Sequence, residues 1–238
     1  MGSLLRRYEA GAYEQVWDEL VTYGAAVREE PLLSEALAVA RETMRRVRAN
    51  IEVLLQRLDA AGYVFADAPV PRWEGPCADA LAQIHALEAL VGPIPLSIRA
   101  CYEMIGTVNF MGHHPALEPR ADDRWDALPD PLVIFPLHSV IADCRERMED
   151  PEWDHDVPLD LPLAPDILHK ANISGGGPYG VYVPDAAADA PLQKEWHATS
   201  FVNYLRLCVR WGGFPGLERY AHPPMELLQH LTDGLLPL

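Results

Sequence analysis

The sequence contains no run of 18 or more apolar residues, although 49% of its 238 residues are hydrophobic. A membrane-spanning helix needs about 20 such residues in succession, so none is expected. The first residues, MGSLLRRYEAGAYEQ, reach charged side chains too early for a secretory signal peptide. Arg6 occupies the position where a myristoylation signal requires serine or threonine. We therefore expect a cytoplasmic protein that has no membrane partner.

Cysteine is scarce, and the four cysteines, Cys77, Cys101, Cys144 and Cys208, lie far apart. None belongs to a CxxC pair, the spacing that a zinc site or a redox motif favours. Isolated cysteines in a chain of this length behave mainly as small buried hydrophobic residues. We therefore predict no disulfide framework, no metal and no other cofactor.

Basic residues are also few: 19 lysines and arginines against 35 acidic residues give a net charge of -16. A field of this sign repels the phosphate backbone, so a nucleic-acid partner is not expected. The same field attracts a basic protein. The alternative is that the acidity only keeps the protein soluble.

Proline is nearly absent from the first part of the chain, where only Pro31 precedes residue 69. Because proline breaks helix interiors, this distribution predicts a helical region at residues 1–66 and a mixed region at residues 77–238. Residues 67–76, within the stretch ADAPVPRWEGP, are predicted to form an extended linker.

One apolar pattern in the helical region repeats every 3.5 residues, which keeps a seam of side chains on one face of a helix. The preceding helix is its expected partner, and the two would form an antiparallel helical hairpin. A dimerising coiled coil is the alternative use of the seam. The seam consists of Leu33, Leu37, Ala40, Met44, Val47, Ile51, Leu54 and Leu58, and the partner face of Tyr13, Val16, Trp17, Leu20 and Val27.

The segment VGPIPLSIRACYEMIGTVNFMG, residues 91–112, carries no evident catalytic group. Gly92 would end one amphipathic helix, Pro95 would begin the next, and Gly106 would end that one. TVNFM then favours a strand. The apolar positions expected in the core are Leu81, Ile84, Leu87 and Val91 in the first helix and Ile98, Cys101, Tyr102 and Ile105 in the second.

The rest of the chain predicts short strands and helices. PLVIFPL favours a buried strand, and HSVIADCRERM a helix after it. DILHKANISGGGPYGVYVPD predicts two strands joined by a glycine-rich turn, with Ile173, Val181 and Val183 in the core. Thr199 or Ser200 would cap a helix that ends at WGGFPG, and PPMELLQHLTDGLL would form the last helix.

The order of these elements resembles the SUKH superfamily, which includes yeast cell-wall-assembly regulators and many bacterial toxin-immunity proteins. The resemblance covers about residues 77–211. It rests on Glu88, Gly92, Ile94 and Pro95 in LEALVGPIPLSIRACYEMIG, on the strand LVIFPL before a helix, and on Ser200, Phe201, Tyr204 and Leu205 in HATSFVNYLRL. The resemblance implies an α+β fold with helices flanking a mixed sheet, and a protein-binding module such as an immunity or regulatory protein.

A metal-dependent hydrolase is the alternative function. It would use His113 and His114 with carboxylates from residues 122–156. Adjacent side chains of an extended segment point to opposite faces, so both histidines could reach one metal only from a loop. No HExxH or comparable spacing ties these residues together. SGGGPYG likewise lacks the Lys-Ser/Thr pair of a phosphate-binding loop.

Residues 143–166 hold the densest charge, with nine acids against Arg145 and Arg147. This composition is typical of a solvated loop. The alternative is a surface that mimics a phosphate backbone and captures a basic partner, such as a toxin, with Trp153 as anchor. Trp211 and Phe214 would join such a surface if WGGFPG is exposed, core packing being their alternative. The predicted partner-binding residues are Glu149, Asp150, Glu152, Trp153, Asp154, Asp156, Trp211 and Phe214.

Overall fold

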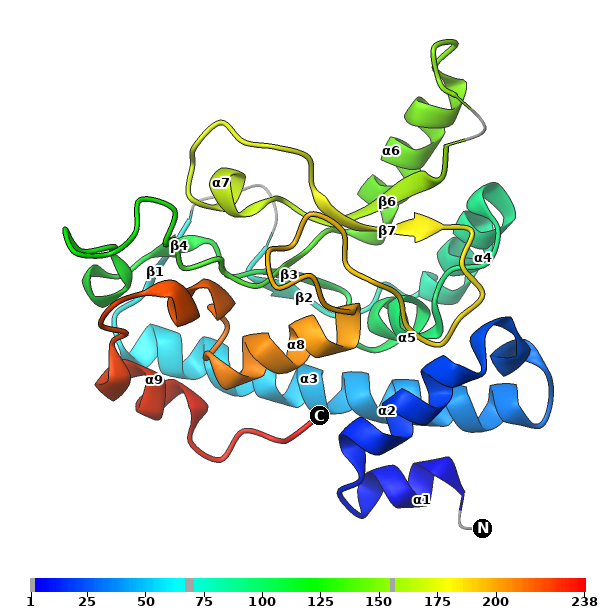
Figure 1. Ribbon diagram of the computed structural model, residues 1–238, viewed down its shortest axis with the longest axis horizontal. Helices are drawn as coiled ribbons and strands as arrows, with labels where there is room; N and C mark the ends of the chain where they lie inside the picture. The colour runs from blue at the N-terminus through cyan, green and yellow to red at the C-terminus, as the bar shows by residue number, and fades with distance from the viewer. Residues whose placement is uncertain (1–2, 67–70, 155–156) are drawn as a thin grey trace.

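The computed structural model describes residues 3–66, 71–154 and 157–238 (Figure 1). The long helix α3 (Leu32–Ala60) runs along one side of the molecule, with α8 (Phe201–Arg210) beside it. Short β-strands form the middle of the molecule, and α6 (Leu137–Glu149) lies beyond them and points outward. The predicted α+β fold is therefore confirmed. None of the described helices is long and apolar enough to cross a membrane.

Three short helical segments precede α3: α1 (Leu4–Glu9), α2 (Tyr13–Thr22) and the 3₁₀ helix η1 (Gly24–Arg28). The predicted seam of α3 is buried from Ala40 to Leu58, while its first two leucines are partly exposed. The expected partner face is also buried, apart from the partly exposed Tyr13. However, the most extensive contact of α3 with another helix is with α5 (Leu96–Met104), so the hairpin explains only part of the seam.

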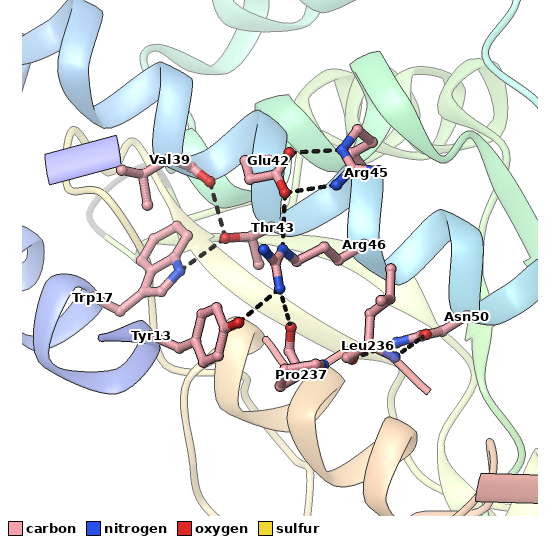
Figure 2. A network of polar contacts seen from close by, with 10 residues as sticks. All are labelled: Tyr13, Trp17, Val39, Glu42, Thr43, Arg45, Arg46, Asn50, Leu236 and Pro237. Carbon is pink, nitrogen blue, oxygen red and sulfur yellow. Dashed lines mark hydrogen bonds and ion pairs between the residues drawn. The ribbon is translucent and has the colours of Figure 1, made fainter. Parts of the chain in front are cut away.

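Polar side chains within this packing fix the neighbours of α3 (Figure 2). The indole Nε1 of Trp17 donates to Oγ1 of Thr43 at 3.0 Å and so ties α2 to α3. The amide of Asn50 donates to the carbonyl of Leu236 at 2.9 Å and accepts from its N–H at 2.8 Å. Arg46 donates to the carbonyl of Pro237 at 3.3 Å. The C-terminal segment is therefore held against the middle of α3.

The helices predicted on either side of Gly92 are α4 (Ala80–Val91) and α5. Gly92 and Gly106 follow them with φ values of 81° and 80°, a backbone conformation that favours glycine, so both predicted stops are confirmed. The predicted core residues of these helices are buried, except that Leu81 is 53% exposed. The prediction for Leu81 was wrong because its position on α4 faces solvent.

The N-terminus of α5 contacts a distant segment. The first N–H groups of a helix have no carbonyl partner within the helix. Here the N–H of Leu96 donates to Ala187 O at 3.2 Å, and that of Ser97 to Ala188 O at 2.9 Å. The Ser97 hydroxyl also donates to the buried carboxylate of Asp189 at 2.7 Å. The segment 91–112 thus serves to join two parts of the fold.

The central strands are short and pair antiparallel. β2 (Trp73–Glu74) pairs with β3 (Thr107–Asn109), and β3 pairs with β5 (Val133–Ile134). β1 (Val64–Phe65) pairs with β4 (Gly112–His113). The strands predicted in TVNFM and PLVIFPL are confirmed. The linker prediction was wrong at residues 73 and 74, which add a strand to β3, and residues 67–70 lie outside the described part of the chain.

A second strand pair combines β6 (Leu159–Ala164) with β7 (Tyr179–Val183), and Leu161 lies opposite Val181. All six residues of β6 are buried, although the sequence places them in the acidic segment. The predicted hairpin across SGGGPYG was therefore wrong. Its first half forms α7 (Ile167–Lys170) instead, and Ile173 is 48% exposed.

The C-terminal part follows the prediction closely. Ser200 caps α8 by accepting from the N–H of Asn203, and Gly212 and Gly213 end the helix with positive φ values. The 3₁₀ helices η2 (Pro115–Leu117) and η3 (Pro215–Arg219) and the helix α9 (Met225–Thr232) complete the elements. The four cysteines are free, and only Cys77 is exposed. One hydrophobic cluster extends from Leu4 to Leu238, so the helical region and the mixed region share a core.

Candidate functional site

The end of α6 and the loop after it form an acidic projection from the body of the protein (Figure 1). We call this surface the acidic tip, and its exposed members are Glu146, Glu149, Asp150, Glu152 and Asp154. Four of the predicted partner-binding residues are among them. Asp156 lies outside the described residues. The carboxylates come together because a helix end and a tight loop follow each other directly in sequence.

An apolar groove of about 470 Å³ adjoins the acidic tip. Trp153 is half-buried in its wall, whereas Val157 and Tyr182 are 50% and 47% exposed. The other apolar walls come from α4 and from the end of β7. Its main lining residues are Leu90, Met148, Trp153, Val157, Tyr182 and Pro184. An apolar groove with acidic side chains at one edge can take up both apolar and basic side chains.

The two aromatic residues of WGGFPG do not belong to this surface. Phe214 is 1% exposed, and its ring centroid lies 5.6 Å from that of Tyr63 in the core. Trp211 is half-buried and packs against the same core. Including Phe214 in the partner-binding site was therefore wrong: the two glycines before it turn the chain inward.

The histidines of the hydrolase alternative do not assemble a metal site. His113 is exposed and lies 3.5 Å from Glu118. His114 Nδ1 accepts from the N–H of Ala116 at 3.1 Å, and its Nε2 lies 3.2 Å from Ala61 O. Backbone groups therefore contact both ring nitrogens, and neither is left for a metal ion. Within residues 3–66, 71–154 and 157–238, no group of three histidine, cysteine or acidic side chains could hold a metal ion.

A second cavity, of about 570 Å³, lies between α6, the end of β6 and the glycine-rich segment before β7. Asp166, which caps α7, and His169 of that helix line it together. The Asp166 carboxylate accepts from two backbone N–H groups, at 2.7 and 3.0 Å, and contacts Nδ1 of His169 at 2.6 Å. These contacts outweigh the effect of burial and lower the pKa of Asp166.

The glycine-rich segment is shaped by this carboxylate. A Cβ atom at Gly175 would lie 2.5 Å from Asp166 Oδ1, so only glycine allows the backbone to approach so closely. A Cβ atom at Gly177 would meet the side chain of Lys194, whereas one at Gly176 meets nothing within 4 Å. SGGGPYG therefore wraps a buried aspartate and forms one wall of the cavity.

Sequence reasoning missed a buried ion pair between Asp130 and Lys170. Both side chains are 0% exposed, and Nζ of Lys170 lies 2.6 Å from Oδ1 of Asp130. Nζ also donates to the Tyr204 hydroxyl at 3.3 Å and lies 4.5 Å from the centre of the Tyr179 ring. The only local sequence feature that could have drawn attention to this ion pair is the aspartate between two prolines in LPDPL. The pair connects a central loop to α7.

Another polar cluster surrounds His197. Its Nδ1 contacts the buried carboxylate of Glu195, and its Nε2 lies 3.2 Å from Glu218. Burial lowers the pKa of His197, but the hydrogen bonds and charges of Glu195 and Glu218 outweigh it, so the pKa lies above its ordinary value. The ring thus joins the segment before α8 to η3, most strongly in its protonated form.

We expect this cluster to make stability depend on pH. Because the pKa of His197 is raised in the folded state, its contribution is full below the unfolded pKa, about 6.5, and is lost as pH rises through the folded value. Urea unfolding of the wild type and of His197→Gln, at pH values on both sides of this range, should show a difference that shrinks as pH rises. A difference that is constant with pH would contradict the assignment.

Comparison of the chain with protein-family models, with curated proteins and with solved structures gives no match. The resemblance to the SUKH superfamily therefore stays a prediction. Function has to be argued from the acidic tip, the groove and the cavity themselves.

Proposed function

We propose that this protein is a non-enzymatic binding module that captures a basic protein partner through the acidic tip and the adjoining groove. The observation that supports it most is the position of Trp153, which lines the apolar groove between exposed acids at residues 152 and 154. Aromatic residues beside charged ones are frequent anchors of protein interfaces. An immunity or regulatory role, as the SUKH resemblance implies, belongs to the same proposal.

The charge of the chain supports this choice of partner. A net charge of -16 accelerates the encounter with a basic protein over distances of about the Debye length, roughly 8–10 Å. The groove then supplies the short-range contact, because burying apolar side chains gives about 25 cal/mol per Å². A partner segment with basic and apolar side chains on neighbouring faces satisfies both features.

Anisotropy of a labelled amphipathic peptide, made of lysine and leucine at helical spacing, tests the proposal. We expect saturable binding that weakens with salt. The triple variant Glu149→Lys, Asp150→Lys, Glu152→Lys should weaken it about tenfold, since each exposed charge pair is worth about 0.2–1 kcal/mol and is replaced by repulsion. Trp153→Ala should weaken it as well, through loss of the anchor.

A matched control separates the site from the overall field. Glu9, Glu14 and Asp18 are exposed acids on α1 and α2, and their replacement by lysine changes the net charge by the same amount. This control should lose much less affinity than the triple variant of the acidic tip. Equal losses in the two triple variants, or full affinity in Trp153→Ala, would refute a defined site and leave only non-specific attraction.

A further inference from the structure

The cavity beside α7 has the size and lining of a small-molecule site. Its volume of about 570 Å³ lies within the range of about 300–1,000 Å³ of ligand pockets. Most of its walls are apolar, and three of them are proline rings, which offer flat surfaces. The apolar lining consists of Met111, Phe135, Val140, Pro162, Pro165 and Pro178.

The charged groups that line the cavity already have partners within the protein. Asp143 Oδ2 lies 2.8 Å from Nε of Arg147, one turn away on α6. Asp166 is satisfied by three N–H donors, two from the backbone and one from His169. A charged ligand would therefore lose its hydration without gaining an unpaired opposite charge. The lining favours an uncharged ligand.

The Asp166–His169 contact determines which nitrogen of the neutral His169 ring can accept a hydrogen bond from a ligand. An ionised carboxylate only accepts hydrogen bonds, so the 2.6 Å contact requires the proton of the imidazole on Nδ1. In the neutral ring Nε2 is then an acceptor, and it has no partner among the described residues. The His169 side chain is 51% exposed and lines the cavity, so a ligand can reach it.

We propose that this cavity binds an aromatic alcohol of the phenol class, with its ring against the prolines and Phe135 and its hydroxyl donating to Nε2 of His169. A phenol is a stronger hydrogen-bond donor than an aliphatic alcohol because its hydroxyl is more acidic. The Ser139 hydroxyl lines the same cavity and can donate to the phenol oxygen in return. This site is separate from the acidic tip and does not depend on the proposed function.

Equilibrium dialysis with 2-naphthol, 2-methoxynaphthalene and 2-naphthoate tests the proposal. The methoxy compound keeps the rings but cannot donate, and the naphthoate is an anion. We expect saturable binding of 2-naphthol that is about fivefold or more tighter than that of either analogue, the value of one net hydrogen bond. No saturable binding of 2-naphthol, or equal affinity for all three compounds, would overturn the proposal.

Two variants locate the binding. In His169→Phe a ring remains but the acceptor is lost, so 2-naphthol and 2-methoxynaphthalene should bind equally. Gly176→Trp should abolish binding of both, because the glycine lines the cavity and a Cβ atom there meets no neighbour within 4 Å, which leaves room for an indole in place of the ligand. Urea unfolding confirms that each variant is folded. A naphthol preference that survives His169→Phe, or unchanged binding by Gly176→Trp, would place the ligand elsewhere.

Discussion

Replacing Asp130 with alanine should lower the free energy of unfolding by about 3–5 kcal/mol, among the largest effects expected for any single side chain here. The variant leaves the ammonium group of Lys170 at 0% exposure without its carboxylate, 2.6 Å away in the wild type. The Tyr204 hydroxyl, 3.3 Å from Nζ, cannot replace a charge. Because a domain is stable by only about 5–15 kcal/mol, urea unfolding should show a clearly lower midpoint.

A double variant distinguishes the lost charge from lost packing. Asp130→Asn with Lys170→Met removes both charges while keeping similar volumes. Asparagine also tolerates the φ of 53° at this position, which alanine does not favour. Since replacing both members of a buried pair is often nearly neutral, the double variant should be much more stable than Asp130→Ala. If Asp130→Ala costs less than about 1 kcal/mol, the ion pair does not hold α7 in place.

This ion pair also shows what the sequence leaves undetermined. Lys170 lies in a stretch that the sequence predicts to be a strand, and charged residues are almost always assigned to the surface. Its burial depends on an acid 40 positions earlier and on Tyr204, 34 positions later. No local pattern relates these three residues.

The elements that could be predicted are those whose signals lie within one or two turns. The seam from Ala40 to Leu58, the cap at Ser200 and the stops at Gly92 and Gly106 are confirmed because each depends on neighbouring residues only. β6 was missed because its burial depends on a residue far away in the sequence. Its acid, Asp160, is ion-paired with Lys194 of a distant segment, which allows a charged residue inside a buried strand.

The candidate site likewise has a part that local sequence predicts and a part that depends on distant contacts. The acids of the tip are contiguous, and composition alone located them. The groove could not be predicted, because Leu90, Trp153 and Tyr182 come from three separate parts of the chain. Phe214 was assigned to the surface because the two preceding glycines predict a turn, but the sequence does not show whether that turn points the next side chain inward or outward.

Gly106 provides the second large effect, because two independent requirements meet at this residue. Its φ is 80°, and a Cβ atom would lie 2.3 Å from the carbonyl oxygen of Glu74 and 2.7 Å from the carbonyl carbon of Gly75. Both atoms belong to the backbone at β2, which pairs with β3. Gly106→Ala should therefore strain the left-handed backbone, at about 1–2 kcal/mol, and also push β2 away. We expect a total loss of about 3 kcal/mol or more in urea unfolding.

Gly62 supplies the matched comparison, since its φ is 81° but a Cβ atom there meets nothing within 4 Å. Gly62→Ala should cost only the backbone strain, about 1–2 kcal/mol. The difference between the two alanine variants then measures the close approach of β2 to the end of α5. If both variants lose the same stability, the close approach of β2 adds no cost, and the glycine at position 106 serves only to end a helix.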